Sequence, residues 1–522
     1  LLIMSFFNSY FTDTQIYLLL FAGLFLLLAF IMHVKEKNIL SVVFLGLTAI
    51  CIFSFSALLD PFLNLWDERF HALVAKNMMN HPLMPTLYDD PVVDMAYDRW
   101  DRYYIWLHKQ PLFLWQIMLS FKIFGLSEFS LRIPNIVMGT ALVIATYRSG
   151  KLIVDRNVGF ISSLLTISTV YIMELAAGRQ ELEHNDFSFL VYISLSIWAF
   201  IEYYYSKKKI WIYLIGLFSG MAILCKWVVG LLVYFGWFVL RLMQKKIKLS
   251  ENKDFLTALS ITLIVALPWQ ILTFLWYPAE AMSAYKFNTS HFTVPLDGHD
   301  GSFWYHFDMF NTIYGKLASF LIIPAFWILY KNNKDKNLLN SLVSMVLVVY
   351  LFFSLAATKM PSFTIVVSMI VIIAFGTLLY YAIEFVNQYV KKDVFKHIIF
   401  IVIITAIVML RFDIGYIADK YTLKKDNNHY TMMLTHNKEV FKSLELPSNT
   451  VLFNVKGRHY IEAMFYTGVP AYNFMPSFEQ YRKLKDKGRI IAVFVKNDEK
   501  IPDFLKDDIS TIFIHKEIMG YE

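Results

Sequence analysis

The chain has 522 residues, of which 57% are hydrophobic and 17% are charged, and its mean hydropathy is +0.49. An average soluble protein carries about 25% charged residues, so this composition excludes a string of ordinary soluble domains. The apolar residues fall in blocks long enough to cross a hydrocarbon core roughly 30 Å thick. The sequence therefore predicts an all-α, polytopic membrane protein. Its net charge is +7, and its two cysteines form neither a disulfide framework nor a metal signature.

Twelve apolar segments are predicted to cross the membrane. Each loop after an odd-numbered segment is basic, for example at Lys207, Lys208 and Lys209. Because cytoplasmic loops carry the excess of Lys and Arg, these loops are expected in the cytoplasm and both chain ends outside. The first segment lacks the basic start and the cleavage site of a signal peptide, so we expect it to be retained. The predicted segments are residues 14–33, 39–58, 133–152, 157–176, 186–205, 209–225, 227–244, 255–276, 312–330, 338–357, 361–386 and 396–415.

The tail differs in composition from the rest of the chain. Charged side chains are about twice as frequent over residues 416–522 as over residues 1–415. This shift predicts a transmembrane domain over residues 1–415 and a soluble extracytoplasmic domain over 416–522. The runs VLFNV and RIIAVFVK are typical of strands and residues 477–487 of a helix, so a small α/β fold is expected. Arg458 and His459 are interpreted as exposed polar side chains without an assigned role.

Acidic and aromatic side chains gather in the predicted outer loops, above all in residues 59–132. A pure transporter usually places its ionisable residues near the bilayer centre, whereas these predicted spans are nearly free of charge. We therefore favour a site at the outer membrane surface, which one substrate reaches from lipid and another from water. The acidic residues of this loop are Asp67, Glu68, Asp89, Asp90, Asp94, Asp98 and Asp101.

Asp67 and Glu68 follow the second predicted span and precede a helical-looking stretch. A carboxylate that is partly removed from water at such a place can have a raised pKa and act as a general base. The alternative is structural, with Asp67 capping the helix that follows.

His108 and Lys109 precede an apolar run that opens at Pro111. A cation at this depth suits a phosphate held at the level of the lipid headgroups. Lys109 could instead extend to the interface among neighbouring aromatic residues. Lys226 and Lys359 are lone lysines in tight outer turns. Since they run against the positive-inside trend, both are candidate anion contacts.

Residues 178–186 place five ionisable side chains, His184 included, between two spans. Such a cluster at a membrane face is costly unless its charges are paired. Arg179 and Glu183 are four residues apart and would share one side of a helix, so a structural ion pair is one interpretation. The other is a polar wall of the site that also includes Asp186.

The loop over residues 285–305 contains His291 and His299, and His306 follows it. Histidines can bind a metal, but the HxxxH and HExxH spacings that would support this do not occur here. No metal site is therefore predicted from the spacing.

Seven motifs lie in one order on the outer side of this topology. They are WDERFHALVAKNM from Trp66, HKQPLFLW from His108, IFGLSEFSLRIP from Ile123, CKWVVG from Cys225, PW from Pro268, TVPLDGHDGSFWY from Thr293 and TKMPSF from Thr358. Because of these seven motifs, residues 55 to 385 resemble the bacterial polyprenyl-phosphate-sugar glycosyltransferases of the GT-C class. These are relatives of the aminoarabinose transferase that modifies lipid A and of the dolichyl-phosphate-mannose-protein mannosyltransferases.

The resemblance implies a GT-C fold and an inverting transfer of a sugar from a polyprenyl-phosphate carrier to a hydroxyl or phosphate at the outer face. Asp67 matches the family's catalytic carboxylate, which orients or deprotonates the acceptor, with Glu68 beside it. Lys109 matches the lysine that contacts the carrier phosphate, whose developing negative charge needs fixed cations. Further phosphate contacts are expected at Arg179, Lys226 and Lys359, and substrate contacts at His71, His108, Glu183, Asp186 and His299.

Several positions differ from the pattern of the lipid A-modifying relatives. Phe70 and His71 replace Arg-Tyr, His108 replaces a common Glu, Gln110 a Pro and Phe363 a Tyr. Asn288 stands where one branch has a metal-binding His. These differences weigh against a bound metal and against an aminoarabinose donor, and they leave the general reaction unchanged.

The expected function is thus a glycosyltransferase of the bacterial inner membrane, with its site on the periplasmic side. Its partners would be a polyprenyl-phosphate-linked sugar, a lipid, glycan or protein acceptor, and membrane lipids, without nucleic acid. No cofactor is assigned, and a divalent metal has no support from the spacing. A lipid-linked sugar flippase or transporter fits twelve spans but not their lack of charge. An inactive scaffold that presents the C-terminal domain conflicts with the intact Asp67 and Lys109.

Overall fold

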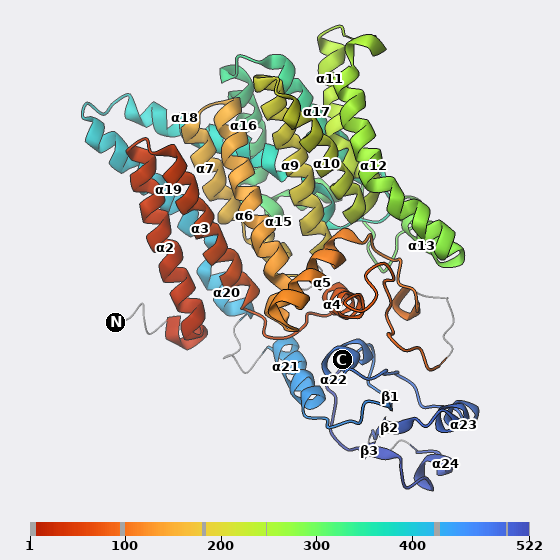
Figure 1. Cartoon of the computed structure of the whole chain (residues 1–522). Coiled ribbons are helices and arrows are strands. Elements are labelled where there is room, and N and C mark those ends of the chain that lie inside the picture. The colour runs from red at the N-terminus through yellow and green to blue at the C-terminus, as the bar shows by residue number, and fades with distance from the viewer. Residues whose placement is uncertain are drawn as a thin grey trace.

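The computed structural model describes residues 7–93, 100–179, 184–246, 248–421, 428–496 and 500–520. Within these ranges, nine helical stretches are long and apolar enough to cross a membrane, so the protein is a multi-pass membrane protein (Figure 1). These stretches are α2 (Asp13–Val34), α3 (Asn38–Ala57), α6 (Glu128–Ile153), α9 (His184–Ser206), α10 (Lys209–Lys226), α12 (Lys253–Trp276), α17 (Lys336–Leu355), η4 (Pro361–Val367) with α18 (Ser368–Asn387), and α19 (Asp393–Phe412) with α20 (Ile414–Tyr421).

Two more apolar stretches are bent in the middle, and each is long enough to cross a membrane only if the helices on both sides of its bend are taken as one span. Helices α7 (Arg156–Ile167) and α8 (Val170–Ala176) meet at 59°, and the stretch Tyr305–Tyr314 meets α16 (Ala318–Asn332) at 86°. The shorter apolar helix Val228–Met243 corresponds to the predicted segment 227–244. Every predicted segment therefore coincides with helix, although three of the twelve are bent or short.

Polar residues at the helix ends explain where several spans begin. Thr12 and Gln15 form a capping box at the start of α2, and Ser127, Asp155 and Asp335 accept a hydrogen bond from the first turn of α6, α7 and α17. Each cap satisfies a backbone N–H that has no partner inside its own helix.

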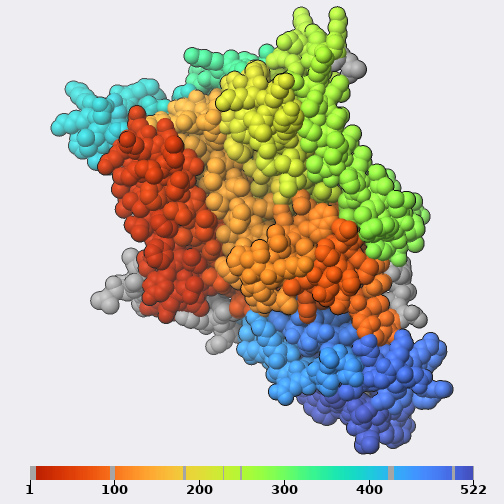
Figure 2. All heavy atoms as spheres, in the orientation of Figure 1, coloured from red at the N-terminus to blue at the C-terminus, as the bar shows by residue number. Residues whose placement is uncertain are grey.

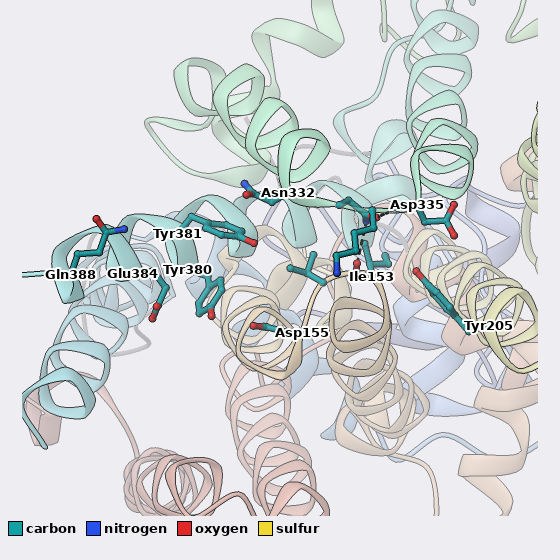
Figure 3. A pocket seen from close by; sticks show the side chains of 12 residues that line it. Ile153, Asp155, Tyr205, Asn332, Asp335, Tyr380, Tyr381, Glu384 and Gln388 are labelled. Atoms are coloured by element: carbon teal, nitrogen blue, oxygen red, sulfur yellow. Dashed lines mark hydrogen bonds between the residues drawn. The ribbon is translucent and has the colours of Figure 1, made fainter. Parts of the chain in front are cut away.

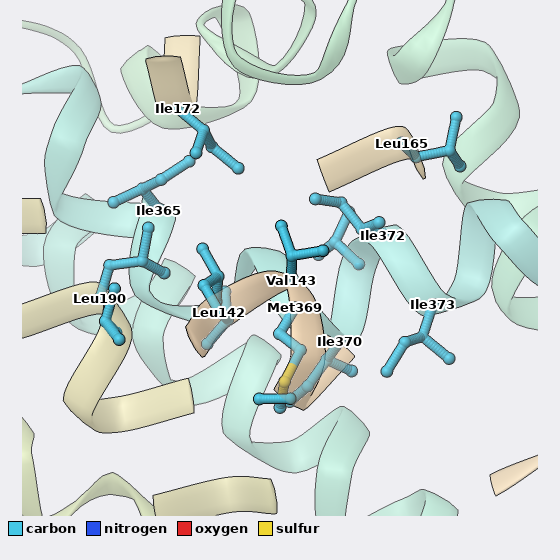
Figure 4. Close-up of a cluster of buried hydrophobic side chains, with 14 of the residues drawn as sticks. Leu142, Val143, Leu165, Ile172, Leu190, Ile365, Met369, Ile370, Ile372 and Ile373 are labelled. Atoms are coloured by element: carbon cyan, nitrogen blue, oxygen red, sulfur yellow. The ribbon is translucent and has the colours of Figure 1, made fainter. Parts of the chain in front are cut away.

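The centre of the helical bundle is a continuous apolar core. Figure 4 shows part of it, where Leu142 and Val143 of α6 face Leu190 of α9 and Met369 and Ile370 of α18. Helices α6 and α7 cross closely because each carries a glycine at the contact. A Cβ on Gly159 would lie 2.3 Å from the Tyr147 carbonyl oxygen, so no larger residue fits without moving a helix.

One end of the bundle carries the first long loop and several short helices. We call it the α4 end, after the helix α4 that follows α3 there. The helices between α3 and α16 that have not been named above, at either end of the bundle, are α4 (Asp67–Asn77), η1 (Trp100–Arg102), α5 (Leu112–Phe124), η2 (Trp227–Leu231), α11 (Leu232–Met243), η3 (Leu249–Glu251), α13 (Pro278–Ser290), α14 (Tyr305–Asp308) and α15 (Phe310–Tyr314).

The C-terminal region, residues 428–520, contains a parallel three-stranded sheet in the order β1-β2-β3. Both predicted strands and the predicted helix are present, the helix beginning at a Ser477–Gln480 capping box. Its elements are α21 (His429–Lys442), β1 (Thr450–Phe453), α22 (Tyr460–Thr467), α23 (Phe478–Asp486), β2 (Ile490–Phe494), α24 (Asp503–Lys506) and β3 (Ile512–Ile514).

This region shares one hydrophobic core with the first long loop. Buried side chains of α4 and α5, such as Phe70 and Phe121, belong to the same cluster as Phe453 of β1 and Phe465 of α22. Figure 2 shows the C-terminal region (blue) seated against the loop (orange) at the α4 end of the bundle. The C-terminal region is therefore packed, through α22, on the part of the chain that carries Asp67.

Candidate active site

Asp67 and Lys109 form an ion pair at the α4 end of the bundle. Lys109 Nζ lies 3.0 Å from Asp67 Oδ2, and their side chains are 14% and 12% exposed. Asp67 is the first residue of α4, whose N-cap is Trp66. The alternative that Asp67 caps this helix is therefore wrong, since the cap lies one residue earlier. Two segments at opposite ends of a long loop thus bring a carboxylate and an ammonium together at the surface.

Glu68, the next residue, points the other way into a closed polar network. Its side chain is fully buried, with Oε1 accepting from Arg132 Nε at 2.8 Å and contacting His184 Nε2 at 2.9 Å. Its Oε2 accepts from the backbone N–H of Asn64 at 2.6 Å and from Arg132 at 2.9 Å. Burial alone would raise the pKa of Glu68, but the charge of Arg132 and the hydrogen bonds from His184 and Arg132 outweigh it and lower the pKa to about 2.

Arg132 is the central cation of this network, and sequence analysis gave it no role. It is fully buried and also donates to the carbonyl oxygens of Ala57 at 2.7 Å, Asp60 at 2.5 Å and Phe62 at 2.8 Å. It therefore fastens the connection between α3 and α4. The available signal was its position in the motif from Ile123, where an arginine stands at the start of a predicted membrane span and needs a buried anion.

Gly178 allows His184 to approach Glu68. Its φ is +63°, and a Cβ there would lie 2.2 Å from His184 Nε2 and 2.8 Å from Glu68 Oε1. Only glycine fits both the backbone conformation and the space.

Arg179 is paired with Asp60, and its predicted pair with Glu183 stays a prediction. Its Nε lies 3.0 Å from Asp60 Oδ2, and it donates to the carbonyl oxygen of Ser56 at 3.1 Å. The side chain is 2% exposed. Glu183, the predicted partner and candidate substrate contact, lies outside the described residues.

Asp186 and Lys226 form a second ion pair, which joins α9 to the end of α10. Asp186 also accepts from the Ser362 hydroxyl, and the Lys226 ammonium lies 4.4 Å from the centre of the Phe363 ring. Lys226 is 25% exposed, whereas Asp186 is buried. Because His184 and Asp186 both belong to the first turn of α9, this pair is connected through that turn to the Glu68 network.

Lys359 and His299 are linked through the backbone. The Lys359 N–H donates to the His299 carbonyl oxygen at 3.0 Å, and the half-exposed His299 thus lies over the turn before η4. The Lys359 ammonium is buried and donates to the carbonyl oxygens of Phe353 at 3.0 Å and Ser354 at 2.6 Å. Of the four predicted phosphate-binding cations, Lys109 and Lys226 are thus partly exposed, and Arg179 and Lys359 are buried.

His71 and His108 are packed among aromatic rings. His71 is fully buried, with its ring 4.7 Å from Phe113, and His108 stacks on Trp100 at 4.5 Å. Both lie close to Asp67 and Lys109 in the chain, so they support the walls of the site.

Arg458 and His459, interpreted from sequence as exposed polar side chains without an assigned role, instead contact the first loop or its neighbours. Arg458 lies 4.9 Å above the Trp66 ring and 3.1 Å from Asp101 Oδ2. His459 is buried and pairs with Glu462, which also faces Arg69 of α4 at 3.5 Å. That interpretation is wrong because α22, which follows this pair directly, packs against α4.

Metal ligands do not converge at the site within the described part of the chain. No group of three or more His, Cys, Asp or Glu side chains there is arranged to hold a metal ion. The carboxylates around Asp67 are instead matched with Lys and Arg, so the charge at the site is balanced by side chains.

A cavity of about 720 Å³ lies at the opposite end of the bundle (Figure 3). Its lining includes Asp155 and Asp335 at the starts of α7 and α17, and Tyr380, Tyr381 and Glu384 near the end of α18. The candidate site lies at the other ends of α17 and η4–α18, so this cavity is separate from it.

Comparisons with known proteins find one family model and one curated relative among the matches. Residues 108–272 match the family model described as dolichyl-phosphate-mannose-protein mannosyltransferase. An uncharacterized protein of Aquifex aeolicus (strain VF5) is 25% identical over 297 residues, and the match spans about half the length of each protein, 56% and 55%.

Two solved structures share the fold. ArnT from Cupriavidus metallidurans, bound to undecaprenyl phosphate, superposes with a TM-score of 0.59 at 16% identity over 87% of this chain and 89% of that one. The oligosaccharyltransferase AglB from Archaeoglobus fulgidus, in complex with an inhibitory peptide and a dolichol-phosphate, gives 0.50 at 11% identity over 82% and 64%. The family match and the shared fold confirm that this chain resembles the GT-C class of polyprenyl-phosphate-sugar glycosyltransferases.

Proposed function

We propose that this protein is a glycosyltransferase that moves a sugar from a polyprenyl-phosphate carrier to an acceptor at the α4 end of the bundle, outside the cytoplasmic membrane. The observation that carries the proposal is the Asp67–Lys109 pair, 3.0 Å apart and partly exposed. Glu68 and Asp186, the other described candidate carboxylates, are buried and held by ion pairs. The C-terminal region belongs on the same outer side, because it packs on the loop that carries Asp67.

The chemistry needs two groups, and the pair provides both. An acceptor oxygen attacks the anomeric carbon of the sugar, whose bond to the phosphate oxygen breaks with inversion. The electron pair leaves with the polyprenyl phosphate, whose negative charge Lys109 and Lys226 stabilise. The acceptor proton passes to Asp67, which acts as the general base. Glu68, with both oxygens already bonded inside the protein, positions α4 and does not contact substrate.

The acceptor is a lipid, a glycan or a protein, and the geometry does not favour one of them. Substrate choice follows from the shape of the pocket and not from the fold. ArnT and AglB use one fold with different partners, which illustrates the range open to this chain.

The test compares a gene deletion strain complemented with wild type, Asp67→Asn, or the control Asp89→Asn, an exposed carboxylate of the same loop. We expect mass spectrometry of lipid and glycoprotein fractions to reveal a sugar-sized mass that wild type and Asp89→Asn restore. Asp67→Asn should restore less than about 1% of it, as expected for loss of a general base worth about 10²–10⁴-fold. Full activity of Asp67→Asn would remove Asp67 from this role. Accumulation of a lipid-linked sugar that Asp67→Asn relieves as well as wild type would indicate a flippase instead.

A further inference from the structure

The turn that joins α3 to α4 is held from outside the membrane bundle by the C-terminal region. We call residues 60–66 the catalytic turn, because Asp67 follows it directly. Lys438 donates to the Pro61 carbonyl oxygen, and Phe62 packs with Met433 and Leu434 of α21. These contacts join parts of the chain that are far apart in sequence.

Tyr430 makes the most specific of these contacts. Its hydroxyl accepts the backbone N–H of Leu65 at 3.1 Å and donates to Asn64 Oδ1 at 3.1 Å. Burial raises the pKa of Tyr430 well above its ordinary value, so the hydroxyl stays protonated and remains a donor. Asn64 in turn donates to Glu68, so one hydroxyl bridges the turn and the first turn of α4.

Trp66 shows why the catalytic turn needs such support. Its backbone has φ +64° and ψ −123°, a combination that residues with a Cβ rarely adopt. Strained dihedrals of this kind persist only where surrounding contacts hold them in place. Tyr430 holds the residue before Trp66, Glu68 bonds to Asn64, and the Arg458 guanidinium lies 4.9 Å above the Trp66 ring. The strain is located one residue before the carboxylate that faces Lys109.

We propose that the C-terminal region is a working part of the active site, in which Tyr430 and Arg458 are positioning residues that hold the catalytic turn so that Asp67 faces Lys109. The proposal rests on Asp67 being the catalytic carboxylate. Neither residue contacts substrate. Their effect falls on the rate of transfer and not on donor affinity, because the proposed phosphate contacts, Lys109 before α5 and Lys226 at the end of α10, lie on other elements.

The experiment uses the full-length protein in lipid nanodiscs, with wild type, Tyr430→Phe, Arg458→Met, Asp67→Asn and the control Tyr481→Phe. Tyr481 also lies in the C-terminal region and its hydroxyl bonds to Asp508 at 3.1 Å, away from the catalytic turn. With a synthetic polyprenyl-phosphate sugar as donor, we expect Tyr430→Phe and Arg458→Met to lower kcat at least tenfold while the donor KM stays within twofold. Tyr481→Phe should remain within twofold in both constants.

Hydrogen–deuterium exchange separates positioning from general unfolding. Tyr430→Phe should speed exchange in peptides covering residues 60–68 and leave peptides from α6, α9 and β2 unchanged. An unchanged kcat and unchanged exchange in Tyr430→Phe would overturn the proposal, and so would a global rise in exchange that accounts for the lost activity. Should Tyr430→Phe fail to fold, Arg458→Met decides by the same criteria. Full activity in Asp67→Asn would remove Asp67 from the catalytic role on which this proposal rests, whereas a wild-type protein that transfers no sugar would count against the proposed function itself.

Discussion

Asp67 and Glu68 are adjacent in the chain, yet their surroundings assign them opposite tasks. Asp67 stays at the surface beside the Lys109 ammonium, whereas Glu68 is enclosed by Arg132, His184 and Asn64. Successive residues of a helix point about 100° apart, so one of the two faces the solvent and the other faces the bundle. A carboxylate doublet at a helix start can therefore serve chemistry and structure at once.

The Glu68 network predicts a large structural effect for Glu68→Gln. This change removes a buried charge and leaves Arg132 without its counter-ion, which typically costs about 3–5 kcal/mol of unfolding free energy. We expect a clear fall in the melting temperature of the detergent-solubilised protein. Glu479→Gln, at a carboxylate that is 79% exposed, is the matched control and should leave the melting temperature within about 1 °C, because an exposed pair contributes little.

The same network makes the stability pH-dependent in a defined direction. The pKa of Glu68 falls from 4.5 to about 2 in the folded protein. The ionised form is favoured by folding, so its stabilisation is complete above about pH 4.5 and is lost as the pH falls toward 2. The difference in melting temperature between wild type and Glu68→Gln should therefore be constant from pH 5 to 8 and narrow below pH 4.5. A difference that grows on acidification would contradict the pairing.

Helix ends supply the cations of the proposed donor site. Lys109 lies just before α5 and Lys226 ends α10, so the two ammonium groups come from separate elements and remain partly exposed. A phosphate that replaced the carboxylates as their partner would make charge-assisted hydrogen bonds to both.

Loss of either lysine should weaken donor binding more than the chemical step. We expect Lys109→Ala and Lys226→Met each to raise the donor KM about tenfold or more, since a hydrogen bond to a charged group contributes about 1.5–3 kcal/mol. Lys122→Met, at an exposed lysine of α5, is the control and should leave the KM unchanged. An unchanged KM in Lys109→Ala would count against its contact with the phosphate.

The elements themselves could be predicted from sequence because hydropathy and turn residues act locally. Each predicted span coincides with helix, and the strand runs and the helix after Ser477 are present in the C-terminal region. The breaks could not be predicted in the same way. The 59° bend falls at Ser168 and Thr169, but hydroxyl residues also lie inside the unbroken helix α7, for example Ser162 and Ser163, so their presence does not mark the break.

The site residues also divide into those that a local sequence signal marks and those that it does not. Motifs singled out Asp67 and Lys109, and the structure joins them. Pairings that depend on distant parts of the chain, such as Arg179 with Asp60 or Arg458 with Trp66 and Asp101, carry no local signal. Sequence separation hides them because each needs the folded bundle or the docked sheet to bring its partners together.

At the scale of the whole molecule, the first long loop and the C-terminal region are joined by one apolar core, which is separate from the core of the membrane bundle. Phe465 of α22 packs 6.1 Å from Phe121 of α5, and Lys76 of α4 donates to the Phe465 carbonyl oxygen at 2.8 Å. The first loop and the sheet therefore form a single packed unit, and damage to one weakens the other.

Phe465→Ala should reveal this coupling. Removing a buried phenyl group costs about 3–5 kcal/mol, and here the cavity opens between α5 and α22. We expect faster hydrogen exchange in α4 and α5 as well as in α22, with the spans α6 and α9 unchanged. Phe478→Ala, at a ring that is 54% exposed, should alter neither region. Exchange that rises only within residues 428–520 would contradict a shared core.

This shared core also sets an order of events during synthesis. The spans up to α19 enter the membrane as they emerge, but the apolar faces of α4 and α5 pack on α22, which the ribosome makes only after the last span. The turn before Asp67 therefore reaches its final form only after translation has passed Tyr430, Lys438 and Arg458, which contact it. A chain arrested before residue 450 would be inserted but not assembled at its α4 end. Chains whose synthesis is incomplete would therefore be inactive without any separate inhibitor.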